Sequence, residues 1–168
     1  NPSFQPAKLI VSEQEPREAF LKHGLYYDLI LLDNALNTTD RLGLPHDGAN
    51  DIAAITRKPV LALPANNSDT KLAGHALIIW NADAQTACAI NRSMALLQQA
   101  AHVSLLVLTD ANRPSRADDE IKNLALNYLA QRGINAEVLQ GSMPEQEESL
   151  GAIIEGKYDY VVAGAYGH

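Results

Sequence analysis

The chain has 168 residues and a mass of 18.2 kDa, which fits one domain of ordinary size or parts of two. Apolar residues make up 46% of it and charged residues 20%, a composition that excludes a disordered tail, a fibre and a low-complexity linker. The formal net charge of −7 is opposite in sign to a surface that neutralises phosphates, so we expect no nucleic-acid partner.

Hydropathy gives no sign of a membrane partner. No apolar run reaches the roughly 18 to 20 residues of a membrane span, and residues 1–5 do not have the pattern of a signal peptide. We therefore expect a soluble protein located in the cytoplasm.

Short β-rich apolar runs alternate with longer stretches of helical periodicity, which is typical of βαβ units around a parallel sheet. In the first part of the chain the pattern predicts strands at residues 8–11, 28–32 and 59–63 and helices at 15–22 and 49–56. Turn-forming residues then crowd positions 64–71, and we place a linker at residues 65–74.

After this linker the alternation resumes. It predicts strands at residues 75–80, 103–108, 135–139 and 158–163 and helices at 84–100, 115–132 and 144–155. Asp83 is the expected N-cap of the first of these helices. Apolar residues recur in that helix at intervals of three and four and predict one packing face, formed by Ala87, Ile90, Met94 and Leu97. Cys88 falls in the same helix, where we expect an inert side chain in the core.

Two segments of the chain repeat. Residues 27–31 and 158–162 both carry Tyr-Asp before a short apolar strand, and they align with an offset of 131 positions. An offset of this size is a domain period. We therefore interpret the chain as two tandem, incomplete copies of one α/β domain within a longer polypeptide, with residues 1–64 in the first copy and 75–168 in the second.

The resemblance of the chain to a known family rests on two segments and the spacing between them. Residues 77–83 combine a strand with Asn81, Ala82 and Asp83 before a long helix, and residues 158–168 combine a strand with a turn that carries Gly164 and Gly167. They resemble the first strand and loop, and the fourth strand and turn, of the universal stress protein family, especially its tandem two-domain bacterial members. The resemblance implies a doubly wound α/β fold with a five-stranded parallel sheet of order 3-2-1-4-5 in each copy.

The resemblance also implies a function in the stress response. Some members bind ATP or another adenine nucleotide, others bind none, and their domains pair as an intramolecular pseudo-dimer or as a homodimer. By position in the family pattern, Asn81 falls where a carboxylate often contacts the nucleoside, and Leu108 falls where a backbone group meets the adenine.

The turn after the last predicted strand has a physical use of its own. Gly164 and Gly167 lack a Cβ, so backbone N–H groups of this turn could approach a phosphate closely. Glycines after a strand are also simple turn formers, and the spacing alone does not separate these two interpretations.

A sheet of order 3-2-1-4-5 binds ligands at the carboxyl ends of its first and fourth strands, where the connections diverge. Both segments of the resemblance follow those strands. The candidate nucleotide-binding residues are therefore Asn81, Ala82, Asp83, Leu108, Gly164, Ala165, Gly167 and His168.

Other kinds of site find little support in the sequence. No Ser/His/Asp, Cys/His or paired-carboxylate arrangement indicates catalysis, so we assign no catalytic residue and do not expect an enzyme. His23, His46, His75 and His102 share no metal-ligand spacing, so no metal is predicted. The alternative function is an interaction module of the same fold that binds no nucleotide and acts through protein partners.

The two copies differ at the candidate turn, and this difference predicts how many nucleotides each chain binds. The segment of the first copy that aligns with residues 164–168 is residues 33–37; it contains no glycine and places Asp33 where the second copy has Gly164. A carboxylate at this position repels phosphate. We expect one adenine nucleotide per chain by titration calorimetry, and two equivalent sites would contradict the prediction.

Overall fold

The computed structural model describes residues 16–33, 48–63, 71–80, 83–109, 116–142 and 157–165. The chain divides into two compact units, Asn1–Ala65 and Asn66–His168, so the division falls within the predicted linker. Each unit combines helices with a parallel sheet, so the fold class is α/β. That the units are two copies of one domain stays a prediction.

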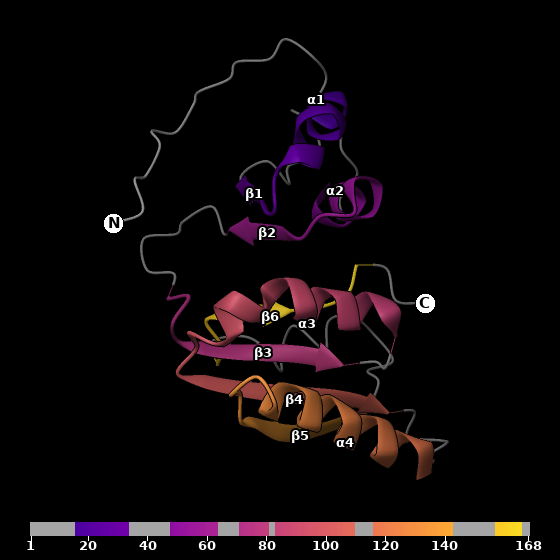
Figure 1. Ribbon diagram of the computed structural model, residues 1–168, viewed down its shortest axis with the longest axis vertical. Helices are drawn as coiled ribbons and strands as arrows, with labels where there is room; N and C mark the ends of the chain where they lie inside the picture. The colour runs from indigo at the N-terminus through magenta and orange to yellow at the C-terminus, as the bar shows by residue number, and fades with distance from the viewer. Residues whose placement is uncertain are drawn as a thin grey trace. The chain divides into compact units, whose positions relative to one another are not determined.

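The first unit is a small βαβ arrangement preceded by a helix (Figure 1). Its strands β1 and β2 pair in parallel, with Ile30 opposite Val60. Its elements are α1 (Pro16–His23), the 3-10 helix η1 (Gly24–Tyr26), β1 (Ile30–Asp33), α2 (Gly48–Thr56) and β2 (Val60–Leu63).

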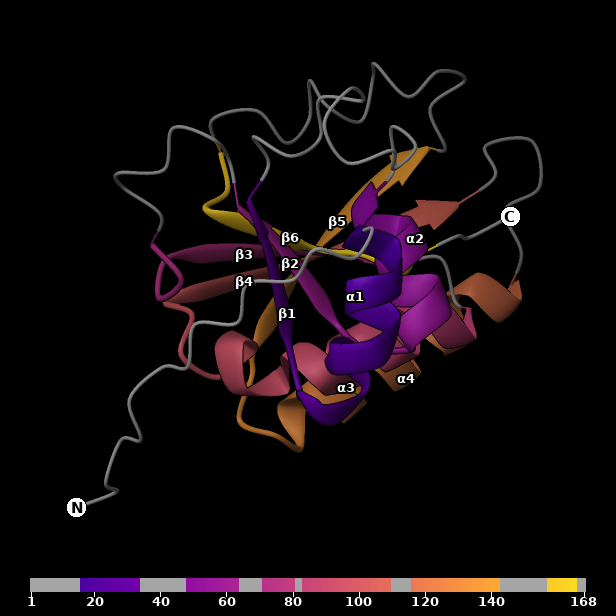
Figure 2. The same cartoon turned by 90° about the horizontal axis from the view of Figure 1, so that it is seen from above.

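The small core of the first unit lies on one face of its sheet. Ile30 and Leu32 of β1 are buried against Ile52 of α2, and Phe20 of α1 packs on the same cluster. Figure 2 shows helices α1 and α2 together on one side of β1. Side chains alternate along a strand, and Leu31, on the other face, is 59% exposed. Among the described helices, α1 and α2 therefore cover the face of β1 that carries Ile30 and Leu32.

The second unit contains a four-stranded parallel sheet. Its strands run in the order β5-β4-β3-β6, so β3 has a neighbour on each side. The elements are β3 (His75–Trp80), α3 (Ala84–Leu97), β4 (His102–Thr109), α4 (Arg116–Ala130), β5 (Ala136–Ser142) and β6 (Tyr160–Val162). The predicted order 3-2-1-4-5 contains a fifth strand, and because the described strands of this sheet number four, the five-stranded order stays a prediction.

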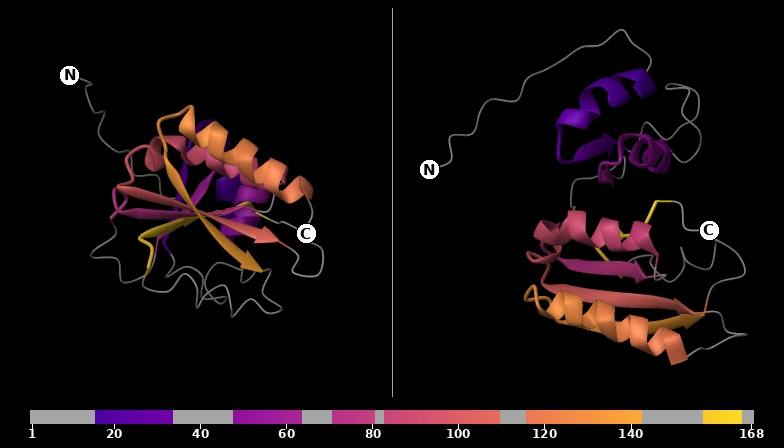
Figure 3. Two further views of the ribbon diagram at one scale, coloured as in Figure 1. Left: turned by 90° about the horizontal axis from the view of Figure 1, so that it is seen from below. Right: turned by 45° about the vertical axis from the view of Figure 1, so that its right-hand side comes forward.

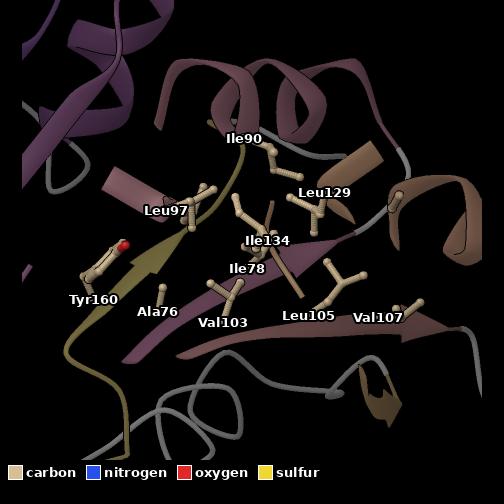
Figure 4. Packing of buried hydrophobic residues seen from close by; sticks show 12 residues of the cluster. Ala76, Ile78, Ile90, Leu97, Val103, Leu105, Val107, Leu129, Ile134 and Tyr160 are labelled. Carbon is tan, nitrogen blue, oxygen red and sulfur yellow. The ribbon is translucent and has the colours of Figure 1, made fainter. Parts of the chain in front are cut away.

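Helices α3 and α4 lie on the same face of this sheet (Figure 3). The parallel register places Ala76 beside Val103 and Ile78 beside Leu105, so these side chains share that face. Figure 4 shows side chains from the strands and both helices meeting in one layer. The buried members of the cluster are Ala76, Ile78, Ile90, Leu97, Val103, Leu105, Val107, Ala125, Leu129, Ile134, Tyr160 and Val162.

The opposite face of the sheet is buried as well. Leu77 of β3 is fully buried, and Ser104 and Leu106 of β4 are each 2% exposed. Burial on both faces is typical of parallel strands, and it explains why β3 and, apart from Ser104, β4 are largely apolar and do not alternate between apolar and polar residues.

Two predictions for the first long helix are wrong. Ala87 is exposed and Thr86 is buried in its place, and Cys88 is exposed instead of lying in the core. At 100° per residue Cys88 is about 200° away from the buried Ile90, so it points away from the sheet. Helix α3 also ends at Leu97, before the predicted end at residue 100.

The remaining predicted elements occur within a few residues of their expected bounds, except for two. The strand at residues 8–11 and the helix at residues 144–155 lie outside the described residues. Among the helices that the structure describes, none combines the length and apolar character needed to cross a membrane.

Helix α4 ends in a Schellman motif. The N–H of Gly133 donates to the carbonyl of Ala130 at 3.0 Å, and the N–H of Ile134 donates to the carbonyl of Leu129 at 3.1 Å. Gly133 has a φ of +79°, a conformation that glycine adopts at little cost. The motif places the buried side chains of Ile134 and Leu129 in the same core.

Substitution of Gly133 tests this helix end. A Cβ at this position would meet no atom within 4 Å, so any loss comes from the backbone alone. We expect Gly133→Ala to lower the free energy of unfolding by about 1 kcal/mol and Gly133→Asn to lower it less, because asparagine tolerates positive φ better. Urea unfolding measures both, and an alanine variant as stable as the parent chain would contradict the assignment.

Candidate functional site

The carboxyl edge of the second sheet contains a close backbone contact. A Cβ built on Gly164, two residues after β6, would lie 2.8 Å from the backbone nitrogen of Thr86 and 3.1 Å from the carbonyl carbon of Gln85. Both atoms belong to the first turn of α3. The turn after β6 therefore reaches this helix only because residue 164 has no side chain.

Asp83 is the N-cap of α3, as predicted. Its φ and ψ of −102° and 166° are extended, and its Oδ1 accepts a hydrogen bond from the Thr86 N–H at 2.6 Å. A negative charge at a helix N-terminus is favourable, so the carboxylate stabilises the start of the helix. Because Asp83 and Gly164 both lie against Thr86, the structure brings these two predicted site residues together.

This meeting point lies where the strand order reverses. The chain passes from β3 through α3 to β4 on one side, whereas β6 lies on the other side of β3 (Figure 1). In open α/β sheets the carboxyl ends of two such neighbouring strands are the usual place for a ligand. Residues 83 and 164 therefore lie at the position where sheets of this kind commonly bind ligands, and the site itself stays a prediction.

Two further predicted residues lie at the same edge. Leu108 belongs to β4, opposite Gly141 of β5, and it follows the last β3·β4 pair, Trp80 with Val107. Ala165 follows Gly164 and is partly buried. The other predicted site residues, Asn81, Ala82, Gly167 and His168, lie outside the described residues.

Trp80 adds a donor that the sequence analysis did not assign to the site. Its Nε1 is buried and has no hydrogen-bond partner among the described residues, at the end of the strand that leads into residues 81–83. An unpaired buried N–H costs about 1 to 3 kcal/mol, so an acceptor at this position would be favourable. The signal in the sequence was a tryptophan at the end of an apolar strand.

The opposite, amino edge of the sheet holds a polar cluster that the sequence analysis also missed. His75 Nε2 lies 2.8 Å from Ser104 Oγ, and the His75 ring packs edge-on against Tyr158 and His102, with ring centroids 4.7 Å and 5.8 Å apart. Ser104 is only 2% exposed, so it is not accessible as a nucleophile. The cluster therefore holds β3, β4 and the start of β6 together.

The described side chains contain no arrangement typical of a metal centre. Within the described ranges, no group of three or more His, Cys, Asp or Glu side chains is placed to hold a metal ion.

Comparisons of this chain with protein-family models, with curated proteins and with solved structures find no match. Any assignment of function therefore depends on the residues and geometry of the chain itself.

Substitution of Gly164 tests the close contact at the carboxyl edge. The added carbon of Gly164→Ala would meet backbone atoms of α3, which cannot move aside as a flexible side chain can. We expect a loss of about 1 to 3 kcal/mol in unfolding free energy and a shift of the Thr86 amide resonance, both from overpacking. Ala163→Ser, at an exposed neighbouring position, should cause neither change. A fully stable Gly164→Ala variant with an unmoved Thr86 resonance would contradict the contact.

Proposed function

We propose that this chain is a universal-stress-protein-like binder of an adenine nucleotide, ATP or a relative of it, which acts in the cytoplasm and does no chemistry on its ligand. The observation that carries the proposal is the turn at Gly164 packed against the start of α3, at the point where the strand order reverses. Of the eight candidate residues, Asp83, Leu108, Gly164 and Ala165 fall at this edge, and the other four lie outside the described residues.

The electrostatics of this edge suggest how a nucleotide would be oriented. The Asp83 carboxylate occupies the N-terminus of α3 and accepts the Thr86 N–H, so the helix end already has its negative group. A polyphosphate would avoid this carboxylate and bind backbone N–H groups of the turn that begins at Gly164. The ribose hydroxyls would then meet Asn81, and the adenine would meet the backbone at Leu108.

The burial of the two repeated strands supports the interpretation of the units as copies of one domain. With the offset of 131, Leu29, Ile30 and Leu31 align with Tyr160, Val161 and Val162. In the first unit Leu29 and Leu31 are 41% and 59% exposed and Ile30 is 6% exposed. In the second unit the pattern is inverted, with Tyr160 and Val162 at 9% and 7% and Val161 at 37%.

The inversion has a simple structural cause. The helices α1 and α2 cover one face of the repeated strand in the first unit, whereas α3 covers its other face in the second. Because parallel strands in complete α/β domains are covered on both faces, a full copy would carry both helix layers. Among the described helices, a covering layer on opposite faces of the repeated strand is what we expect of two copies of such a domain.

One observation favours the alternative, an interaction module without nucleotide. The described part of the first unit exposes large apolar side chains close together in sequence, namely Leu25, Tyr26, Tyr27, Leu29 and Leu31. Tyr26 is 84% exposed, and tyrosine is enriched at protein interfaces.

Native mass spectrometry of the purified protein separates the two functions. A bound adenine nucleotide supports the proposal, and a ligand-free chain that does not bind added ATP supports the module.

The identity of residue 81 provides the sharpest test of the nucleotide site. An amide accepts a hydrogen bond from a ribose hydroxyl and adds no charge, so Asn81→Asp should change ATP affinity by about 1 kcal/mol or less. Asn81→Leu should cost about 1 to 3 kcal/mol, because a polar partner is left unpaired. Titration calorimetry measures both, with circular dichroism as the check on folding. If a folded Asn81→Leu variant binds ATP like the parent chain, the placement of the site is wrong.

A further inference from the structure

Asp159 joins the amino ends of β6 and β3 through two hydrogen bonds. Its Oδ2 accepts the backbone N–H of His75 at 2.7 Å, and its own backbone N–H donates to the carbonyl of His75 at 2.9 Å. One residue of the β6 segment therefore pairs with both backbone groups of one residue of β3. We call this pair of hydrogen bonds the Asp159 clasp.

The clasp depends on a glycine. A Cβ built on Gly74 would lie 2.0 Å from Asp159 Oδ2 and 2.5 Å from its Cγ, so any side chain at residue 74 would displace the carboxylate. The carboxylate takes the place of a backbone carbonyl at the end of the ladder and satisfies the first N–H of β3. A glycine at residue 74 therefore leaves the space that this carboxylate occupies.

The clasp is connected to the candidate site through a very short strand. Strand β6 has three residues, all paired with β3, from Ala76 opposite Tyr160 to Ile78 opposite Val162. Among the described strands β3 is its only neighbour, so few other bonds hold its position along β3. Gly164 lies two residues after β6 and packs so closely against Thr86 that no space is left for a Cβ.

From this arrangement we infer that Asp159 is a positioning residue for the candidate ligand site at the far end of β6. The clasp fixes where β6 lies along β3, and β6 in turn sets where Gly164 meets the first turn of α3. The inference rests on the proposed function for the identity of the site, but its mechanical part concerns Asp159, Gly164 and Thr86 alone.

Hydrogen exchange of the ligand-free chain tests the mechanical part. In Asp159→Ala we expect amide exchange in residues 160–165 and in the first turn of α3 to quicken about tenfold, while α4 keeps its rates. Asp159→Asn retains an acceptor oxygen and should stay within about threefold of the parent chain. Asp28→Ala, at the aligned position of the first unit, should leave both segments unchanged.

A second variant reaches the same clasp without altering Asp159. Gly74→Ala should quicken exchange in residues 160–165 and at Thr86 by a similar factor, because its Cβ displaces the carboxylate. If either variant instead quickens exchange equally in α4, or leaves Thr86 and Gly164 at their parent rates, Asp159 is a local structural residue and the inference is overturned.

Titration with ATP then separates this inference from the proposed function. If the parent chain binds ATP, Asp159→Ala should weaken that binding about tenfold or more while Asp159→Asn retains it, and equal binding by Asp159→Ala would overturn the positioning role. If the parent chain binds no ATP, the proposed function fails, and the exchange measurements still decide whether Asp159 positions Gly164.

Discussion

The second unit depends on the pairing of β3 with a strand on each side. Its partners β4 and β6 come from segments that are distant in the sequence, and both run parallel to it. Parallel pairing places all amino ends at one edge of the sheet and all carboxyl ends at the other. The polar cluster around His75 and the close approach of Gly164 to α3 both follow from this single arrangement.

The two edges of this sheet are held by different sets of contacts. At the amino edge the side chains of Ser104 and Asp159 bind His75, the Tyr158 and His102 rings pack on its imidazole, and the backbone N–H of Asp159 donates to the His75 carbonyl. At the carboxyl edge the Asp83 carboxylate accepts a backbone N–H of α3, and Gly164, which has no side chain, lies against the same first turn. The amino edge therefore depends on side chains that reach across strands, whereas the close contact at the carboxyl edge depends on the lack of a side chain at residue 164.

Tyr160 of β6 places a polar group in the core of the second unit. Its phenol is buried beside α3 with no hydrogen-bond partner among the described residues, and burial raises the pKa of the hydroxyl above its ordinary value. The ring itself contributes apolar area to the core, with Ala76 directly opposite it in β3. The strand that carries Gly164 is thus held by apolar packing on one face and by the Asp159 clasp at its start.

The sequence by itself determined the α/β class, most element bounds, and the cap at Asp83, because these depend on local periodicity, turn residues and capping groups. It misplaced Cys88 and Ala87. The helical periodicity alone defines the face of the helix that packs on the sheet only to within about one residue in each turn. Only the tertiary structure joined His75 to Ser104, His102 and Asp159, and Gly164 to Thr86. Those contacts are set by strand register and strand order, which bring together residues that are 27 to 84 positions apart, and no local pattern records them.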